Sequence, residues 1–276
     1  MITQQTLEFF FKLLKNESGL VLDASKKYLL ETRLEPIVAQ EGFSSIEDLG
    51  VHLMEKRDPI LREKVVDATT TNETSFFRDK HPFETLKEVI LPALIKTNKR
   101  TRQLRIWCAA SSTGQEPYSI AMFLSDMAMQ FRGWDIQILA TDISDRVLKK
   151  AEEGMYSQHE IQRGLPTPYL LRYFDKLGMR WKIKDAVKRM VTFKKLNLLS
   201  NFSSIGLVDI IFCRNILIYL DRKTKHNVVK RMTQLLSAEG VLFLGSTEML
   251  LDFGDRLICV GSRRSRYFQK NGKTVV

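Results

Sequence analysis

The stretch that decides the fold reads Leu104-Arg-Ile-Trp-Cys-Ala-Ala110, followed directly by Ser111-Ser-Thr-Gly-Gln-Glu-Pro117. The first part is a short apolar run. The second consists of small and polar residues and ends at a proline, which is favoured in the first turn of a helix. This order predicts a strand, a tight turn and a helix that opens at Pro117. In an open parallel sheet, nucleotide-like ligands bind at such a turn because backbone N–H groups and the helix N-terminus face the crevice.

Three further apolar runs follow this first one, at Ile136–Ala140, Val208–Cys213 and Val241–Leu244. Helical stretches separate the first three runs, and continuous apolar strands separated by helices indicate a parallel sheet buried on both faces. Near the end of the chain, Leu257–Val260 and Ser265–Gln269 predict an antiparallel hairpin at the sheet edge. We therefore predict an α/β, Rossmann-like domain. A terminal hairpin of this kind is expected of methyltransferases that depend on S-adenosyl-L-methionine (AdoMet).

The first 80 residues predict helices only. Apolar residues recur at helical spacing in two successive segments, Leu7–Leu14 and Leu29–Val38, and Gly19 and Gly42 follow them as helix ends. We assign residues 1–80 to an all-α N-terminal domain plus a junction, and residues 81–276 to the α/β domain. The stretch of about 155–195 fits neither pattern and is expected to be a small insertion. Within it, Arg180–Lys184 alternates charged and apolar residues like an exposed edge strand.

Composition and charge limit the classes of protein and of binding partner that the sequence fits. The chain of 276 residues is 44% hydrophobic and 27% charged, which is typical of a globular protein. Its formal net charge of +11 is uneven: residues 145–200 carry +7 and residues 255–276 carry +5, whereas residues 1–80 carry −3. An evenly basic surface would favour a nucleic-acid binder, but a local excess favours a docking face for an acidic partner. Ordinary solvated lysines and arginines are the equally open alternative.

The sequence shows no apolar run long enough to span a membrane and no signal-peptide pattern. Its three cysteines, Cys108, Cys213 and Cys259, are scattered and lack metal-ligand spacing. An odd and scattered set argues for a reducing compartment and against a disulfide or metal site. We expect a soluble, cytoplasmic protein without a bound metal.

Two carboxylates lie where a positively charged adenosine ligand would need them. The turn after the first strand has a single glycine, Gly114, so the three-glycine dinucleotide fingerprint is missing. Glu116 lies where a pyrophosphate would have to bind, which disfavours NAD and favours a ligand with a positive group. Asp142 ends the second predicted strand, where it can accept hydrogen bonds from ribose hydroxyls. The simpler alternatives are a plain structural turn and a helix cap at Asp142 or Ser144.

The third predicted strand ends in Cys213-Arg-Asn-Ile-Leu-Ile-Tyr219, which places Arg214, Asn215 and Tyr219 toward the crevice. The Asn/Asp-Pro-Pro-aromatic motif of DNA amino-methyltransferases is absent there. Arg214 suits an anionic methyl acceptor through bidentate pairing, although a buried structural pair with a carboxylate competes with this reading. The segment Thr69–Arg78 at the junction is rich in threonine, which favours a linker or a helix cap over an uninterrupted helix.

Four motifs together resemble the chemotaxis receptor glutamate methyltransferases of the CheR type. They are Thr-Asn-x-Thr-x-Phe-Phe-Arg at 71–78, Ser-Thr-Gly-Gln-Glu-Pro-Tyr-Ser at 112–119, Thr-Asp-Ile-Ser at 141–144 and Phe-Cys-Arg-Asn at 212–215. The resemblance covers nearly the whole chain. It implies a helical N-terminal domain, a Rossmann-like catalytic domain and a small antiparallel β-subdomain inserted in it.

The resemblance also implies the reaction: transfer of the AdoMet methyl group to receptor glutamates, giving methyl esters and S-adenosyl-L-homocysteine (AdoHcy) in sensory adaptation. Carried over position by position, the expected AdoMet contacts are Asn72, Thr74, Arg78, Glu116, Asp142, Asn197, Leu198, Arg214 and Asn215. We expect Arg214 or Tyr219 to orient the acceptor carboxylate. A glutamate with a pKa near ~4.3 is already ionised at neutral pH and needs no general base.

One departure concerns the partner. Members of the family that dock on a receptor's C-terminal pentapeptide carry a Gly-x-Gly insertion in the β-subdomain, and the matching stretch here, Phe174–Trp181, is shorter and has one glycine. We therefore expect a monomer of the pentapeptide-independent type that acts on the cytoplasmic methylation helices of chemoreceptors, without membrane insertion or nucleic acid. Lys26 and Arg33, seven residues apart on the second predicted helix, are candidates for docking on these glutamate-rich helices. A nucleic-acid methyltransferase on the same cofactor fold is the alternative.

Overall fold

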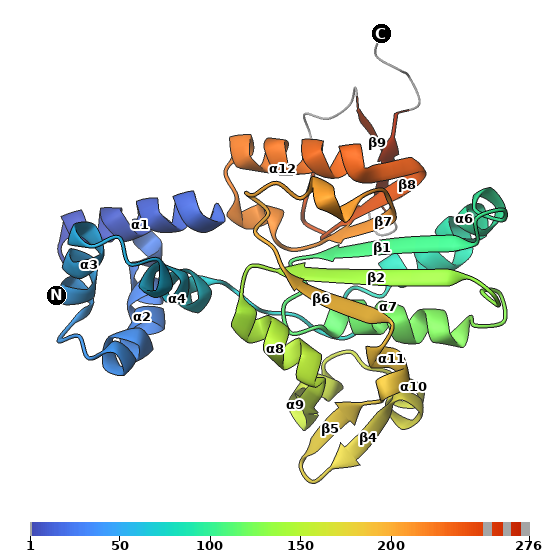
Figure 1. Cartoon of the computed structure of the whole chain (residues 1–276), viewed down its shortest axis with the longest axis horizontal. Helices are drawn as coiled ribbons and strands as arrows, with labels where there is room; N and C mark the ends of the chain where they lie inside the picture. The colour runs from blue at the N-terminus through green and yellow to red at the C-terminus, as the bar shows by residue number, and fades with distance from the viewer. Residues whose placement is uncertain (1, 251–255, 262–265, 272–276) are drawn as a thin grey trace. The chain divides into compact units, whose positions relative to one another are not determined.

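The computed structural model describes residues 2–250, 256–261 and 266–271 of the chain (Figure 1). The chain forms two compact units. A helical unit comprises the residues up to Thr71 together with Tyr219–Lys225, and a catalytic unit comprises Asn72–Ile218 and the residues from His226 onward.

The helical unit contains α1 (Gln4–Ser18), α2 (Lys27–Glu41), α3 (Ile46–Glu55) and α4 (Pro59–Thr69), with a short 3₁₀ turn, η1 (Ala24–Lys26), before α2. The apolar positions that predict the first two helices form its core, and Phe10, Leu14 and Leu30 are fully buried. Gly19 and Gly42 end α1 and α2 in the left-handed conformation, which glycine adopts without a steric penalty. The predicted all-helical N-terminal region is confirmed.

The catalytic unit is built on a seven-stranded sheet in the order β6-β2-β1-β7-β8-β10-β9. Its strands are β1 (Gln103–Ala109), β2 (Asp135–Asp142), β6 (Val191–Lys195), β7 (Val208–Cys213), β8 (Leu236–Leu244), β9 (Leu257–Val260) and β10 (Tyr267–Lys270). The first five strands in this order are parallel, as the apolar runs predict. All six residues of β7 are buried, because helices cover both faces of a sheet of this type.

The order of the strands fixes the position of the site. From β1 the chain moves outward to β2 and β6, and it then returns to the other side of β1 to form β7 and β8. Ligands of open α/β sheets bind outside the carboxyl ends of the strands at such a reversal. The predicted turn after β1 lies at this point. The helix that follows it, α7 (Gln115–Asp126), begins two residues before Pro117, because Gly114 in the left-handed conformation already starts the helix.

The far edge of the sheet carries the predicted antiparallel pair. β10 pairs antiparallel with both β8 and β9, and Tyr267 lies opposite Val260. The linking residues 262–265, which include the predicted start of the last strand at Ser265, lie outside the described residues. Further helical elements are α5 (His81–Thr85), a π-helical turn η2 (Leu86–Ile90), α6 (Leu91–Thr97), α8 (Asp145–Glu153) and α12 (Arg222–Leu235), with short 3₁₀ turns η3 (Ser203–Ile205) and η4 (Leu217–Tyr219).

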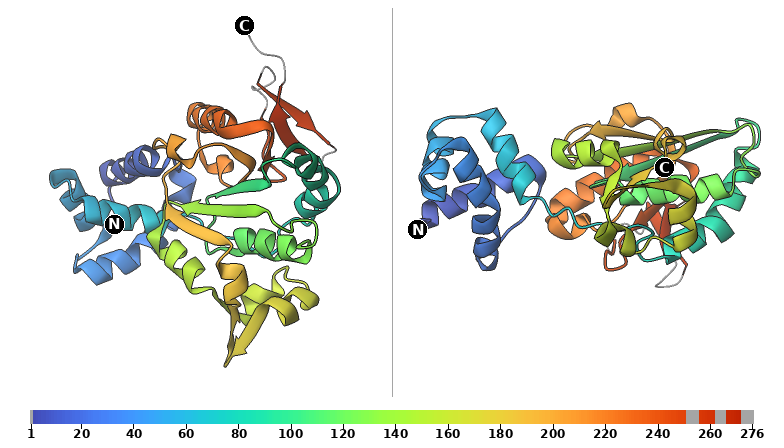
Figure 2. Two further views of the ribbon diagram at one scale, coloured as in Figure 1. Left: turned by 45° about the vertical axis from the view of Figure 1, so that its right-hand side comes forward. Right: turned by 90° about the horizontal axis from the view of Figure 1, so that it is seen from below.

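A separate three-stranded antiparallel sheet confirms the small antiparallel β-subdomain that the family resemblance implies (Figure 2). Its order is β3-β5-β4, with β3 (Met155–Ser157), β5 (Arg180–Ile183) and β4 (Phe174–Leu177), and α9 (Gln158–Gln162), α10 (Thr167–Tyr173) and α11 (Asp185–Lys188) accompany it. We call these three strands the small sheet. The expectation of an edge strand at Arg180–Lys184 is wrong, because β5 is the central strand. Alternation of charged and apolar residues indicates that one face of a strand is exposed to solvent. It does not indicate whether the strand has a neighbouring strand on each side.

The strand β6 also falls within the stretch 155–195, but it pairs in parallel with β2 and belongs to the main sheet. Among the described residues, no helix is both long enough and apolar enough to cross a membrane.

Candidate functional site

The loops at the carboxyl ends of the strands are held in strained conformations. Residues other than glycine adopt positive φ angles at Ala110 (57°), Ser112 (50°) and Asn215 (60°), and in the junction at Phe77 (47°), Asp79 (68°) and Lys80 (48°). Each such residue costs on the order of 1–3 kcal/mol and persists only where the surroundings fix it. Strained residues of this kind cluster at functional sites. Here they fall on the loops after β1 and β7 and on the segment that leads into α5.

Asp142, at the end of β2, holds the turn after β1. Its buried carboxylate accepts hydrogen bonds from the backbone N–H of Ser112 (2.8 Å) and of Ser144 (3.1 Å). The N–H of Ser111 donates to the carbonyl of Thr141 (2.9 Å). The helix cap itself is Ser144, which accepts from the N–H of Val147. Asp142 therefore fixes the turn, and the capping role proposed as its alternative belongs to Ser144.

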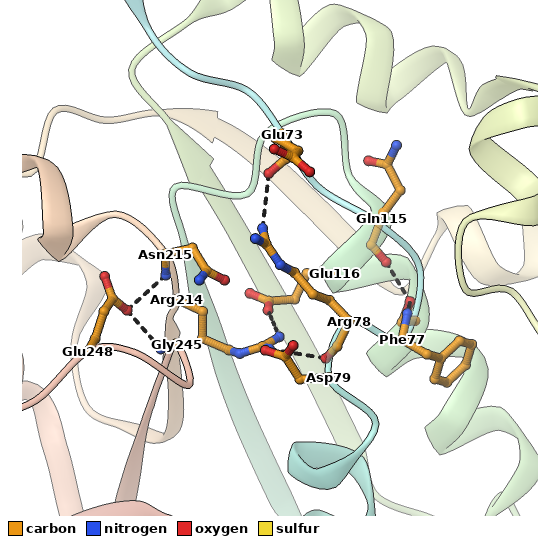
Figure 3. Close-up of polar contacts among 11 residues, drawn as sticks. Glu73, Phe77, Arg78, Asp79, Gln115, Glu116, Arg214, Asn215, Gly245 and Glu248 are labelled. Atoms are coloured by element: carbon orange, nitrogen blue, oxygen red, sulfur yellow. Dashed lines mark hydrogen bonds and ion pairs between the residues drawn. The ribbon is translucent and has the colours of Figure 1, made fainter. Parts of the chain in front are cut away.

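Arg214, at the end of β7, is the buried centre of the site (Figure 3). Its side chain is 2% exposed. Nη1 donates to the Glu116 carboxylate (2.6 Å), and Nη2 donates to the Asp79 carboxylate (2.6 Å) and to the carbonyl of Arg78 (3.0 Å). One cation between two carboxylates leaves this cluster with a formal charge of −1. Arg214 and Glu116 are largely excluded from water, so this net negative charge attracts a cationic ligand.

These contacts bear on the predicted role of Arg214. Both of its η nitrogens are already paired, as in the structural alternative that the sequence left open. Its Nε atom is buried and has no hydrogen-bond partner among the described residues. Orientation of the acceptor by Arg214 stays a prediction.

Glu248, between β8 and β9, is a second buried carboxylate at this edge, with 1% exposure. Its Oε2 atom accepts from the backbone N–H of Gly245 (2.7 Å) and of Asn215 (2.8 Å), and its Oε1 atom accepts from the N–H of Ile218 (3.2 Å). Figure 3 shows how this carboxylate joins the loop after β7 to the loop after β8. Sequence reasoning missed Glu248, although a single acid within Val241–Leu251 was a signal for it.

The other predicted AdoMet contacts lie on segments that these bonds position. Leu196 donates its N–H to the Asp142 carbonyl (2.8 Å), and this bond places Asn197 and Leu198 beside the end of β2. The carbonyl of Leu198 accepts from Arg231 Nη2 (2.6 Å). The carbonyl of Asn72 accepts from Ser112 Oγ (2.8 Å).

Thr74 and Arg78, in the junction, are the last two of the predicted AdoMet contacts in the catalytic unit. Thr74 is half-buried, and Arg78 Nη1 donates to the carbonyl of Glu73 (3.1 Å). Sequence reasoning missed Asp79, although it directly follows the Phe-Phe-Arg motif.

Tyr219 differs from the other candidates because it packs within the helical unit. Its carbonyl accepts from the N–H of Val21 (3.0 Å), and Leu20 forms a β-bridge with the next residue, Leu220. Its predicted role in orienting the acceptor stays a prediction.

Cys108, on β1, lies close to the cluster but is not a nucleophile. Burial raises the pKa of its thiol well above the usual value, and the nearby Glu116 carboxylate raises it further against the opposing effect of Arg214. A neutral, buried thiol is inert. Among the described residues, no group of three histidine, cysteine or acidic side chains could hold a metal.

The sheet order and the acidic, glycine-poor turn after β1 define the class of the protein as an AdoMet-dependent methyltransferase. Residues 72–266 match the family described as CheR methyltransferase, SAM binding domain, and residues 5–70 match CheR methyltransferase, all-alpha domain. The chain belongs to the CheR methyltransferase family.

Relatives of similar length support this membership. The chain is 43% identical to chemotaxis protein methyltransferase 1 of Pseudomonas aeruginosa, over 90% of this chain and 91% of the relative. It is 41% identical to chemotaxis protein methyltransferase Cher2 of Pseudomonas putida, over 88% and 90%. It is 40% identical to chemotaxis protein methyltransferase 1 of Vibrio cholerae, over 92% and 93%. The predicted AdoMet-dependent protein-glutamate O-methyltransferase of chemotaxis is thereby confirmed at the level of the family.

The residues present fit AdoMet. Three buried polar atoms on the loops after β1 and β7 have no hydrogen-bond partner among the described residues: Ser111 Oγ, Arg214 Nε and Asn215 Oδ1. Buried polar groups are normally satisfied, so these atoms are available to a ligand. The carboxylates of Glu116 and Asp142 suit the ammonium group and the ribose hydroxyls of AdoMet.

Replacing Glu248 tests the link between the two loops. We expect Glu248→Gln to lower the free energy of unfolding of the protein by about 1–3 kcal/mol, because the amide replaces one acceptor oxygen with a donor and leaves buried N–H groups unpaired. Chemical denaturation followed by circular dichroism measures this loss. Glu239→Gln, at an exposed position of β8, is the matched control and should change stability by less than about 0.5 kcal/mol. Equal stability of both variants would contradict the prediction.

Proposed function

We propose that the site at the carboxyl ends of β1, β2, β6 and β7 binds AdoMet and that this enzyme methylates glutamate side chains on the cytoplasmic methylation helices of chemoreceptors. The observation that carries this proposal is the pairing of the buried Arg214 with Glu116 and Asp79 at the reversal of strand order. The residues proposed to hold the cofactor are Asn72, Thr74, Arg78, Glu116, Asp142, Asn197, Leu198, Arg214 and Asn215. All of them belong to the catalytic unit.

In this proposal each carboxylate has its own task. Glu116, in the first turn of α7, accepts from the ammonium group of the cofactor, and its pairing with Arg214 fixes its direction. Asp142 accepts from the ribose hydroxyls, and the N–H groups of Ser112 and Ser144 fix the direction of its carboxylate. Arg78 pairs with the carboxylate of the cofactor. When bound, AdoMet supplies a sulfonium-activated methyl group, and the products are a glutamate methyl ester and AdoHcy.

The protein supplies position and needs no acid–base chemistry. The acceptor glutamate is ionised at neutral pH, since its pKa lies near ~4.3, so no group has to remove a proton. Orientation of two reactants can lower a barrier by about 7–11 kcal/mol. We assign orientation of the acceptor to Arg214 or Tyr219. A pocket of about 630 Å³ beside Asp79, Leu244 and Glu248 supports entry of the acceptor over the end of β8.

The proposed enzyme does not need a docking pentapeptide on the receptor. The loop between β4 and β5 holds only Gly178 and Met179, because Leu177 pairs directly with Arg180. A two-residue loop has no room for a Gly-x-Gly insertion, which supports the pentapeptide-independent type.

We further propose that the enzyme acts in the cytoplasm as a monomer, without nucleic acid or membrane insertion. The division into residues 1–80 and 81–276, with an insertion at about 155–195, likewise stays a prediction.

Methylation of receptor fragments tests the function. We expect methyl-labelled AdoMet to label a panel of receptor signalling fragments equally with and without a C-terminal pentapeptide. The label should be released as methanol by mild base, because methyl esters hydrolyse readily. Fragments whose acceptor glutamates are replaced by alanine should remain unlabelled. Base-stable label, or label found only in polynucleotides, would contradict the proposal.

Removal of the Asp142 carboxylate tests the cofactor assignment. Asp142→Ala should raise the AdoMet dissociation constant tenfold or more, because both the ribose contact and the anchor of the turn are lost. Isothermal titration calorimetry measures this constant. Asp145→Ala, which removes a half-exposed carboxylate three residues away, is the control and should leave the constant within twofold. An unchanged constant for Asp142→Ala removes the ribose assignment.

The structure sharpens the test of docking. Arg33 donates to the carbonyl of Thr69 and to the hydroxyl of Thr71, so its guanidinium already bonds within the helical unit. Lys26 closes η1 ahead of α2 and is exposed. Lys26→Glu should therefore raise the KM for the receptor fragment about two- to fivefold, the effect expected of a rim charge, with an unchanged dissociation constant for AdoMet. Lys56→Glu, at another exposed lysine of this unit, is the control. Equal effects of the two variants would contradict a docking role for Lys26.

A further inference from the structure

The small sheet contacts two segments near β1, one that carries predicted cofactor residues and one that directly precedes such a residue. We call Asn72–Arg78 the junction segment and Ala110–Gly114 the cofactor turn. The family resemblance predicts AdoMet contacts at Asn72, Thr74 and Arg78 on the junction segment, and at Glu116 two residues after the cofactor turn. No site residue had been predicted on the small sheet itself.

The first contact is with the junction segment. Phe76 is fully buried, and its ring packs edge-on against Tyr156 of β3 (5.0 Å between centroids) and Phe174 of β4 (5.6 Å). Next to the small sheet, Gly164 approaches the same backbone so closely that a Cβ atom would lie 2.2 Å from the Phe76 carbonyl. Arg163 pairs with Glu73 (2.7 Å). The junction segment is therefore packed against the insertion.

The second contact is a single buried hydrogen bond to the cofactor turn. The Tyr156 hydroxyl donates to the carbonyl of Thr113 (2.9 Å), and the Tyr156 side chain is fully buried. Burial raises the pKa of Tyr156 well above its usual value, so the hydroxyl keeps its proton and remains a donor. A Cβ atom on Gly114 would lie 3.2 Å from this hydroxyl oxygen. Tyr156 thus bonds to Thr113 and leaves little room for a side chain at the next residue of the turn.

The cofactor turn needs such support because it is strained. Ala110 and Ser112 both have positive φ angles, and a strained backbone persists only where the surroundings fix it. Thr141 and Asp142 of β2 hold the turn from one side through the N–H groups of Ser111 and Ser112. Tyr156 holds its far end. Loss of that bond would let the turn leave the conformation in which Glu116 and the N–H groups face the ligand.

We propose that Tyr156 is a positioning residue for AdoMet, acting through Thr113, and that the small sheet is a structural part of the cofactor site. This inference rests on the proposed function, because it assumes that the cofactor turn contacts AdoMet. When only a fraction of the protein has the binding-competent turn, the apparent dissociation constant rises by the inverse of that fraction. Tyr156 therefore determines affinity for the cofactor without touching it.

Two matched variants test this inference. Tyr156→Phe keeps the ring contacts with Phe76 and Phe174, so the fold is retained and only the hydroxyl is lost. Tyr118→Phe is the control, because Tyr118 is also fully buried and also lies against Gly114, but its hydroxyl donates to the carbonyl of Ala151 in α8 (2.8 Å) and not to a carbonyl of the cofactor turn. Both variants should lower the melting temperature by a similar amount.

Binding of AdoHcy, measured by calorimetry, separates a positioning role from a merely structural one. We expect Tyr156→Phe to raise the AdoHcy dissociation constant about three- to tenfold, the range that corresponds to one hydrogen bond. The Tyr118→Phe variant should stay within twofold of the wild type. In methylation assays, Tyr156→Phe should raise the KM for AdoMet, with unchanged KM for the receptor and unchanged kcat at saturating AdoMet.

The outcomes distinguish this inference from the proposed function. If the wild type binds AdoHcy and Tyr156→Phe binds it equally well, the inference is overturned and the proposed function stands. Equal weakening of binding in both variants also overturns it, because the effect is then general. If the wild type binds neither AdoMet nor AdoHcy, the proposed function fails and the inference fails with it.

Discussion

A single buried guanidinium connects the parts of this site. Arg214 at the end of β7 pairs with Glu116 in the first turn of α7 and with Asp79 directly after the junction segment. A charge with 2% exposure is tolerated only when it is paired and hydrogen-bonded, and removing one partner of such a pair typically costs about 3–5 kcal/mol. The loop after β7, the helix after β1 and the junction therefore have to keep their mutual positions.

The same cluster explains why the fold binds a cationic cofactor and not a dinucleotide. Two carboxylates and one guanidinium leave a net negative charge close to the N-terminus of α7, where a pyrophosphate would otherwise bind. Methyl transfer to glutamate requires little of the protein beyond the positioning of its two reactants. An ionised glutamate and a sulfonium methyl group react when they are held in line, so the protein contributes geometry instead of acids and bases.

That geometry depends on a backbone that is unfavourable by itself. The strained residues Ala110, Ser112 and Asn215 are fixed by bonds from neighbouring elements. Asp142 holds the turn after β1, Glu248 holds the loop after β7, and Tyr156 reaches the turn from the small sheet. The insertion is thus more than an appendage on the main sheet, because it packs against both Phe76 and the cofactor turn.

Local patterns in the sequence were enough for the fold class. Helical spacing in Leu7–Leu14, the apolar runs that became β1, β2, β7 and β8, and the terminal antiparallel pair were all predicted. The acidic turn at Glu116 and the carboxylate at Asp142 were recognisable for the same reason: both follow directly from strand–turn–helix order. The edge-strand expectation for Arg180–Lys184 failed because alternation describes the faces of a strand and not its neighbours.

Only the tertiary structure decided what the charged groups do. Arg214 lies 98 residues from Glu116 and 135 from Asp79, and the three N–H groups that hold Glu248 come from two separate loops. The energy of an ion pair or a buried hydrogen bond depends on distance in space and on exclusion of water, and neither is encoded in local residue order. The sequence by itself determined the elements, the family and the types of side chain at the strand ends. Folding determined which of these charges meet, and that Tyr156 supports the cofactor turn from a different sheet.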